Sequence, residues 1–274
     1  MALFAAALAI GLSIAMAISC LVAITTGKSG WIDATWSLAV GLFGAAAALG
    51  GPFGAETTTR QWLVALLALI WSLRLGLHIA VRTAGSDRDD PRYAQLKSEW
   101  GPAFRSRLFL FLQIQAAVAF VLVLSIMAAA HNPAAFPSVG DGIGIALMLV
   151  AVAGEALSDR QLAAFRANPA NAGLVCDVGL WGLTRHPNYF FEWLGWLAYA
   201  AIAINTSGTY GWGWLAQAGP ALMYWLLVHV SGIPPLEAHM LRSRGDRFRR
   251  YQQRVNAFWP GPPRGAASVE GRRS

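Results

Sequence analysis

The chain has 274 residues, of which 56% are hydrophobic and 13% are charged, and its mean hydropathy is +0.46. Soluble domains carry about 25% charged residues, so this composition excludes an ordinary soluble protein and indicates a protein of the membrane. The two cysteines, Cys20 and Cys176, form neither a disulfide framework nor a metal motif. The net charge of +7 is informative mainly through where the basic residues lie.

Seven apolar segments are long enough to cross a bilayer as helices, which takes about 20 residues each. In chain order they cover residues 2–26, 31–53, 61–81, 108–130, 140–163, 188–205 and 211–232. The first has no basic stretch ahead of it and is too long for the core of a secretion signal, so we interpret it as a true span. We therefore expect an all-α integral membrane protein with seven transmembrane helices. Residues 1–260 should form a single domain, followed by a basic, disordered tail at 261–274.

The basic residues fall on one side of this arrangement. Nineteen of the 21 lysines and arginines are Lys28 or lie within residues 82–107, 160–185 and 242–273. Seven spans put these four regions in one compartment, which the positive-inside rule identifies as the cytoplasm. The N-terminus is then outside and the C-terminus cytoplasmic, in a multi-pass protein of the inner (cytoplasmic) membrane. We expect membrane lipid, and not nucleic acid, to meet the basic surface.

Ionisable residues inside or at the edge of the apolar segments are expensive, because a charge near mid-bilayer costs about 2.5–3.5 kcal/mol on insertion scales. They are Asp33, Arg74, His78, Glu155 and Glu192. Pairing between helices could satisfy any one of them, but all five together favour a functional cavity.

Helical spacing groups these residues into stripes, because positions four residues apart share a face. The stripes are Arg74, His78 and Arg82; Glu155, Asp159 and Arg166; and Asn188 and Glu192. We expect them to line a polar cavity that opens to the cytoplasm.

Two polar loops add candidates for binding a large anionic ligand. The sequence DRDDPRYAQL at 87–96 supplies Asp89, Asp90, Arg92 and Tyr93 directly after the third span. No glycine-rich dinucleotide motif and no P-loop occurs, so neither a Rossmann domain nor a P-loop fold would hold that ligand.

The second loop leads into the sixth span. Arg185 and His186 precede Pro187, which suits the first turn of a helix. Backbone N–H groups at a helix start, with basic side chains beside them, make an anion site. Tyr251 lies in the basic amphipathic stretch 241–260 that follows the last span.

Four segments together resemble the bacterial branch of the steroid 5-alpha-reductase family. They are GWIDATW at 30–36, WSLRLGLHIAVR at 71–82 followed by DDPRY at 89–93, GLWGLTRHPNYFFEWLGW at 179–196, and PLEAHMLRSRGDRFRRYQQRVNAFWP at 235–260. The similarity covers nearly the whole chain, and the combination is specific. R-H-P-x-Y alone is shared with membrane methyltransferases of phospholipids and isoprenylcysteine.

The resemblance implies a seven-helix membrane oxidoreductase that binds NADPH from the cytoplasm and reduces an enone C=C bond. The implied activity is that of a 3-oxo-5-alpha-steroid 4-dehydrogenase acting on a steroid-like enone. The cofactor-binding residues it implies, together with those from the loops, are Arg82, Asp90, Arg92, Tyr93, Asp159, Arg166, Arg185, His186, Asn188, Tyr189, Glu192, Glu237 and Tyr251. No metal is expected.

The expected catalytic residues are Asp33, Arg74 and His78, and the expected substrate contacts are Trp36 and Trp71. Where animal members of the family have Gln-Glu, this chain has Ile32-Asp33, and Trp71 falls near the position of their substrate-facing tyrosine. We expect apolar neighbours to keep Asp33 protonated, so that it donates a hydrogen bond to the enolate oxygen. Arg74 and His78 are the alternative donors, and His78 could instead supply the final proton. In a purely structural alternative, Asp33 only pairs with Arg74 and ties two helices together.

Two other functions remain open from the sequence. An S-adenosylmethionine-dependent methyltransferase of a lipid or prenylcysteine would share R-H-P-x-Y, although such enzymes usually have fewer spans and lack the D-D-x-R-Y loop. A transporter or lipid-binding protein could use the buried charges as a path. The one-sided clustering of polar residues and the absence of symmetry between the halves argue against transport.

Overall fold

The computed structural model describes residues 2–50, 56–86 and 89–264, and in these residues it contains helices and no strand. The described chain divides into two compact units. The first comprises residues 1–148 and 196–221, and the second comprises residues 149–195 and 222–274. The expectation of an all-α protein is therefore confirmed for the described residues, while the interpretation of 1–260 as a single domain stays a prediction.

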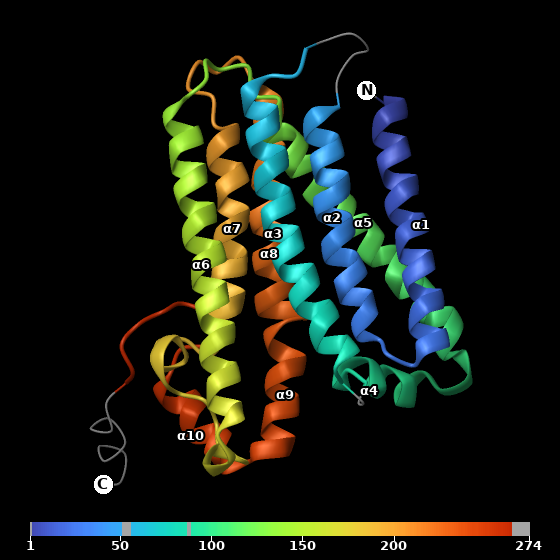
Figure 1. Cartoon of the computed structure of the whole chain (residues 1–274), viewed down its shortest axis with the longest axis vertical. Helices are drawn as coiled ribbons and strands as arrows, with labels where there is room; N and C mark the ends of the chain where they lie inside the picture. Colours follow the sequence, from blue (N-terminus) through green and yellow to red (C-terminus); the bar gives the residue numbers. More distant parts are fainter. Residues whose placement is uncertain (1, 51–55, 87–88, 265–274) are drawn as a thin grey trace, which may run out of the picture. The chain divides into compact units, whose positions relative to one another are not determined.

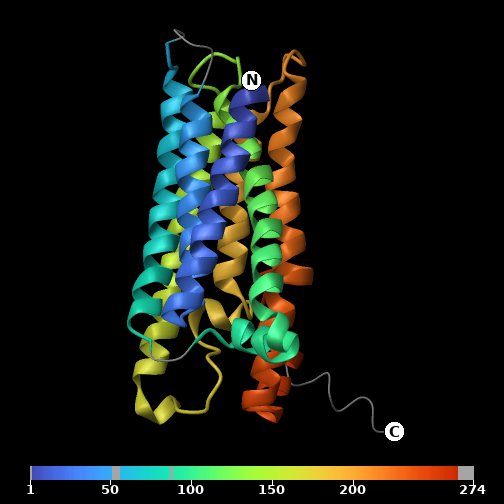
Figure 2. The same cartoon turned by 90° about the vertical axis from the view of Figure 1, so that its right-hand side faces the viewer.

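Four long helices form the body of the first unit: α1 (Ala2–Thr26), α2 (Gly30–Leu49), α3 (Thr59–Ala84) and α5 (Phe104–Ala130). They run alongside one another, with α2 in contact with each of the other three (Figure 1, Figure 2). Small residues allow the closest approach. A Cβ atom added at Gly41 of α2 would lie only 2.0 Å from the Cβ of Ser72 on α3, so this pair of helices requires a glycine there.

Two short elements lie between α3 and α5, namely α4 (Pro91–Trp100) and the 3-10 turn η1 (Gly101–Ala103). Asp90 caps α4 by accepting a hydrogen bond from the backbone N–H of Arg92 at 2.9 Å, and Pro91 occupies the first turn, where its missing N–H has no cost. Thr58 and Gln61 form a reciprocal capping box at the start of α3. These local signals fix where both helices begin.

Five helical segments of the described chain are long and apolar enough to cross a membrane: Ala2–Thr26, Gly30–Leu49, Thr59–Ala84, Pro91–Ala130 and Val139–Ala167 (α6). They agree with the first five predicted spans, except that residues 51–53 of the second lie outside the described residues. They indicate a membrane protein.

The last two predicted spans are helical but less regular. The helix α7 (Pro187–Ala203) has 17 residues, which is short for a bilayer. Residues 211–230 are divided among the 3-10 helix η4 (Gly211–Gln217), α8 (Ala218–Trp225) and the π-helix η5 (Leu226–Val230). Glycines and Pro220 in this stretch weaken a continuous α-helical hydrogen-bond ladder. The number of seven spans and their orientation therefore stay predictions.

A buried ion pair closes one end of the first unit. Arg60 at the start of α3 meets Asp141 at the start of α6, with Nη2–Oδ2 and Nε–Oδ1 distances of 2.8 Å, and both side chains are at most 3% exposed. Arg60 also donates to the backbone carbonyls of Asn132, Ala134 and Ala135. Arg60 is thus a structural residue whose N–H groups are bound by the protein.

The second unit contains residues 149–167 of α6, the first half of α7 and the C-terminal helices α9 (Ile233–Arg244) and α10 (Asp246–Arg254). The 3-10 turns η2 (Pro169–Asn171) and η3 (Gly179–Gly182) lie in the connection between α6 and α7. Phe248, Tyr251 and Val255 form a small buried cluster. Gly245, with φ +54°, makes the sharp turn between α9 and α10.

The segment after α10 is tied to the loop ahead of α7. Thr184 pairs with Asn256 in an isolated bridge, and the Thr184 hydroxyl also lies 3.0 Å from the carbonyls of Ala257 and Phe258. The backbone N–H of Arg185 donates to the Asn256 carbonyl at 2.8 Å. The start of α7 is therefore held from the C-terminal side of the chain. Residues 265–274 of the predicted tail lie outside the described residues.

Candidate functional site

The predicted site residues divide between the two units, and each group is described by itself. The first unit contains Asp33, Trp36, Trp71, Arg74, His78, Arg82, Asp90, Arg92 and Tyr93. The second contains Asp159, Arg166, Arg185, His186, Asn188, Tyr189, Glu192, Glu237 and Tyr251.

Asp33, in the first turn of α2, is the centre of the first group. One of its carboxylate oxygens accepts a hydrogen bond from Arg92 Nη2, and the other accepts from the Tyr93 hydroxyl at 3.1 Å. The side chains of Arg92 and Asp33 are 39% and 23% exposed, so the pair can be reached from solvent. We expected a protonated Asp33 that donates, with Arg74 as the alternative partner. The structure instead places Asp33 as an acceptor of two hydrogen bonds, which is the geometry of an ionised carboxylate.

Arg92 is held from two sides. Besides Asp33, it donates from Nε and Nη2 to Asp90 at 3.0 and 2.9 Å. Burial would raise the pKa of Asp90, but the hydrogen bonds and charge of Arg92 outweigh it and hold that pKa below its ordinary value. Asp89 anchors the same loop by accepting from the backbone N–H and hydroxyl of Ser29, at 2.7 and 3.1 Å. The guanidinium is therefore oriented by the protein alone.

The predicted stripe of Arg74, His78 and Arg82 lies along α3, with Arg74 partly buried and the other two exposed. Trp71, one turn earlier, is 2% exposed and meets Trp196 edge to face with ring centroids 5.2 Å apart. Trp36 donates its indole N–H to the Gln115 carbonyl at 3.1 Å. Both tryptophans thus have packing roles in the structure, and their predicted contact with substrate stays a prediction.

Glu237 of α9 is the centre of the second group and accepts four hydrogen bonds. Arg185 donates to it from Nε and Nη2 at 2.7 and 3.1 Å, His186 Nε2 lies 2.9 Å away, and Gln252 Nε2 donates at 2.6 Å. Burial alone would raise the pKa of Glu237, but the hydrogen bonds from His186 and Arg185, the charge of Arg185 and the Gln252 amide lower it to about 2. One carboxylate therefore ties together α9, α10 and the start of α7.

Arg185 is fully engaged with the protein. Its Nη1 donates to the backbone carbonyls of Gln252 and Val255 at 3.2 and 2.5 Å, in addition to the two bonds with Glu237. The sequence predicts that Arg185 contacts phosphate. In the structure its N–H groups instead hold the C-terminal segment beside α7, so any part it has in binding would be indirect.

His186 is 3% exposed and stacks on Tyr189, with ring centroids 5.4 Å apart and an interplanar angle of 10°. Burial lowers the pKa of His186 from its ordinary value of 6.5, and this outweighs the opposing effect of Glu237. Its Nδ1 atom is buried with no hydrogen-bond partner. The neutral imidazole of His186 therefore lies directly before α7, with Nε2 bound to Glu237 and Nδ1 without a partner.

The remaining members of the second group lie on α6, α7 and α10. Glu192 is 5% exposed, Asn188 is half-buried one turn before it, and Glu155 of α6 is 4% exposed. On α6, Asp159 is half-buried and Arg166 is exposed. Tyr251 donates to the Trp181 carbonyl at 2.5 Å, and burial raises the pKa of its phenol.

Helices α6 and α7 approach closely within the second unit, because a Cβ added at Gly154 would lie 2.4 Å from the Phe191 ring. The two buried glutamates are the immediate chain neighbours of this contact. Two carboxylates on closely packed helices are a costly arrangement. Both Glu155 and Glu192 were recognised in the sequence as ionisable residues within apolar segments.

Among the residues of these networks, Gln252 was not predicted from the sequence. It is a polar residue in a hydrophilic segment, where nothing in composition or spacing separates it from solvated neighbours. Asp89 was among the polar residues predicted from the loop at 87–96, although its bonds to Ser29 were not predicted.

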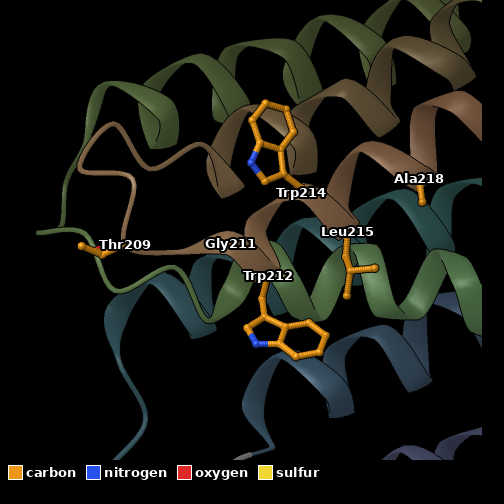
Figure 3. A pocket seen from close by; sticks show the side chains of 6 residues that line it. All are labelled: Thr209, Gly211, Trp212, Trp214, Leu215 and Ala218. Atoms are coloured by element: carbon orange, nitrogen blue, oxygen red, sulfur yellow. The ribbon is translucent and has the colours of Figure 1, made fainter.

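An open hollow of about 730 Å³ lies in the first unit, at the end where α5 finishes (Figure 3). It is lined by Thr209, Gly211, Trp212, Trp214, Leu215 and Ala218. The two tryptophans are 73% and 78% exposed, and none of the lining side chains is ionisable. Exposed tryptophans at the ends of apolar helices are typical of contact with the lipid–water interface.

Comparison with known families identifies the chain at the level of the family. Residues 20–255 match the family model described as "Protein of unknown function (DUF1295)". The chain belongs to the DUF1295 family. DUF1295 is a steroid 5-alpha-reductase-like family, and the DUF1295 match includes every predicted site residue from Asp33 to Tyr251. No curated protein and no solved structure matches the chain.

Proposed function

We propose that the protein is an NADPH-dependent membrane reductase that reduces the C=C bond of a lipophilic enone, with 3-oxo-Δ4 steroids as the first substrate class to test. The observation that carries this proposal is the set of buried or half-buried acceptors at the start of α7. His186, Asn188 and Glu192 lie within two turns there, in a chain of the DUF1295 family.

The side chains at the start of α7 suit the uncharged donor groups of a dinucleotide. A carboxamide and ribose hydroxyls present N–H and O–H donors, and the Glu192 carboxylate, the Asn188 amide oxygen and His186 Nδ1 are matching acceptors. Arginines with exposed guanidinium groups suit phosphate better than the engaged Arg185 does. Arg166 in the second unit and Arg82 in the first are exposed. When bound, NADPH supplies the hydride.

The Asp33 group supplies the polar chemistry that enone reduction needs. As hydride reaches the β-carbon, negative charge develops on the carbonyl oxygen, and a donor already in place stabilises that charge most effectively. Asp33 fixes both Arg92 and Tyr93, which are donors. We therefore assign Asp33 the role of orienting Arg92, with Arg92 meeting the oxygen, because the single O–H of Tyr93 is already donated to Asp33.

The same proposal includes the place of the protein in the cell. Seven spans, with the N-terminus outside and the basic regions in the cytoplasm, would make it a multi-pass protein of the inner membrane that receives NADPH from the cytoplasm. The exposed Trp212 and Trp214 would then lie at the outer lipid interface.

The test uses the full chain in detergent or bilayer discs with NADPH and a 3-oxo-4-ene steroid. The expected result is oxidation of NADPH together with a product heavier by two hydrogens, and NADPH deuterated at the transferred position should leave one deuterium at the β-carbon. Methyl transfer from S-adenosylmethionine to a lipid or prenylcysteine, without NADPH oxidation, would replace this proposal with the methyltransferase.

A further inference from the structure

We propose that Glu237 is a positioning residue that fixes His186 as the neutral Nε2–H tautomer and so presents His186 Nδ1 as a hydrogen-bond acceptor. The ligand group that meets His186 is then an O–H or N–H donor, and not a phosphate. The assignment of the ligand rests on the proposed function, whereas the assignment of the tautomer does not.

The geometry of the contact decides which nitrogen carries the hydrogen. His186 Nε2 lies 2.9 Å from Glu237 Oε1, and Arg185 Nε donates to the same oxygen at 2.7 Å. An ionised carboxylate can only accept, so Nε2 must donate. In a neutral imidazole this leaves Nδ1 with its lone pair, and the identity of the tautomer follows from the partner of the other nitrogen.

Burial favours the neutral form of the His186 ring and outweighs the charge of Glu237. Glu237 from α9 and Arg185 from the loop are the charged groups that act on it, while Gln252 of α10 and Tyr189 of α7 add no charge at neutral pH. Burial lowers the pKa of His186 in spite of Glu237, and the low pKa of Glu237 keeps that carboxylate ionised. The ring therefore stays neutral around pH 7.

The Nδ1 atom is the part of His186 that the protein leaves unsatisfied. It is buried and has no hydrogen-bond partner, which is unfavourable for a polar atom. A ligand donor that reached it would remove this cost. The lone pair of Nδ1 lies in the ring plane, so the donor must approach in that plane, beside the face that Tyr189 covers.

The first experiment records the ¹⁵N spectrum of the full chain labelled at its five histidines. The His186 signals are assigned by their loss in His186→Asn. The expected pattern between pH 6 and pH 8 is a protonated Nε2 and an unprotonated Nδ1. Addition of NADPH should shift the Nδ1 signal, whereas inorganic phosphate alone should not. A charged ring at pH 7, or a hydrogen on Nδ1, overturns the proposal.

The second experiment changes the partner. In Glu237→Gln the side-chain amide can donate to Nε2, which permits the opposite tautomer. We expect at least part of the His186 signal to change to the Nδ1–H form and the Kd for NADPH to rise at least ten-fold. Glu237→Asp keeps the charge and should keep the tautomer, with a smaller loss of affinity. An unchanged tautomer in a folded Glu237→Gln protein contradicts the proposal.

A matched control is Glu99→Gln, because the exposed Glu99 also accepts a glutamine hydrogen bond, from Gln95 at 2.7 Å. It should alter neither the His186 spectrum nor the NADPH Kd. If Glu237→Gln does not fold, the wild-type spectrum and Glu237→Asp still decide the question. If His186 has the expected tautomer but the protein does not bind NADPH, only the proposed function is refuted. If the protein binds NADPH but His186 has the opposite tautomer, only this inference is refuted.

Discussion

Arg92 and Asp33 form an ion pair that joins α4 to the first turn of α2. The same guanidinium is bound by Asp90, and the second oxygen of Asp33 is bound by Tyr93. These residues come from two regions about 60 positions apart in sequence, so the contact exists only through the fold. In this contact Asp33, which the sequence predicted to be an acid, accepts hydrogen bonds and holds Arg92 and Tyr93 in place.

Replacing Asp33 with Asn tests this role. The amide keeps the shape of the side chain but removes the charge that orients Arg92, so enone reduction should fall by at least a hundred-fold. The ion pair is partly exposed, and exposed pairs contribute roughly 0–1 kcal/mol, so folding and the NADPH Kd should stay within a few-fold of wild type. The measurements are steady-state reduction, thermal unfolding and equilibrium NADPH binding.

Asp246→Asn is the control for this substitution, because Asp246 forms an exposed ion pair with Arg249 on α10. It should leave all three measurements unchanged. Full reductase activity in Asp33→Asn would remove Asp33 from the mechanism.

The buried pair of Arg60 and Asp141 should matter for stability and not for chemistry. Removing one partner leaves an uncompensated buried charge, which costs about 3–5 kcal/mol. We expect Asp141→Asn to lower the unfolding temperature strongly, while the remaining folded protein keeps wild-type NADPH affinity. The double variant Arg60→Met, Asp141→Leu should recover part of the loss, because no isolated charge remains. A single variant as stable as wild type would contradict this account.

The stability of the fold in acid should depend on Glu237. Its pKa in the folded protein is about 2, against an ordinary value of 4.5. A depressed folded pKa gives stability that is present above the unfolded pKa and is lost as the pH falls through the folded pKa. Unfolding free energy should therefore decrease by about 3 kcal/mol between pH 4.5 and pH 2.

The measurement is denaturant unfolding at a series of pH values. Glu237→Gln should be less stable at neutral pH and should lose most of the decline across that window. His186 has a depressed folded pKa as well, so its own contribution declines earlier, below its ordinary pKa of 6.5. Equal slopes for wild type and Glu237→Gln below pH 4.5 would show that Glu237 is not the group responsible.

The sequence predicted the local features of the structure but not the contacts between distant segments. The apolar lengths predicted where α1, α2, α3, α5 and α6 lie, and Pro187 predicted the start of α7, because these features are local. Spacing also identified Glu192 and Asp33 as unusual. The bonds of Asp33 to Arg92, of Arg60 to Asp141 and of Glu237 to Arg185 could not be predicted, because each joins segments more than 50 residues apart. The π-helix in the last span has no periodicity of its own from which to predict it.

The membrane orientation gives a prediction that does not depend on the chemistry. A reporter fused after Ser274 should be cytoplasmic and one fused before Met1 external, because an odd number of spans separates them and 19 of 21 basic residues then face the cytoplasm. Reporters in the same compartment would contradict both the seven spans and the one-sided placement of the polar residues.

The acceptors on α7 should control cofactor affinity. Buried hydrogen bonds to charged groups are worth about 1.5–3 kcal/mol, so Glu192→Ala should weaken NADPH binding at least ten-fold, and so should Asn188→Ala. Glu99→Ala, on the exposed surface of α4, is the control and should bind like wild type. Wild-type affinity in Glu192→Ala would exclude α7 as the binding element.

The most direct test of the account is equilibrium binding of NADPH and of S-adenosylmethionine to the purified full chain, measured side by side. Transfer of energy from the tryptophans to the nicotinamide ring reports NADPH, and calorimetry reports both ligands. We predict saturable binding of NADPH at a single site and none of S-adenosylmethionine at the same concentrations. Tight binding of S-adenosylmethionine with none of NADPH would contradict the reductase and support the methyltransferase.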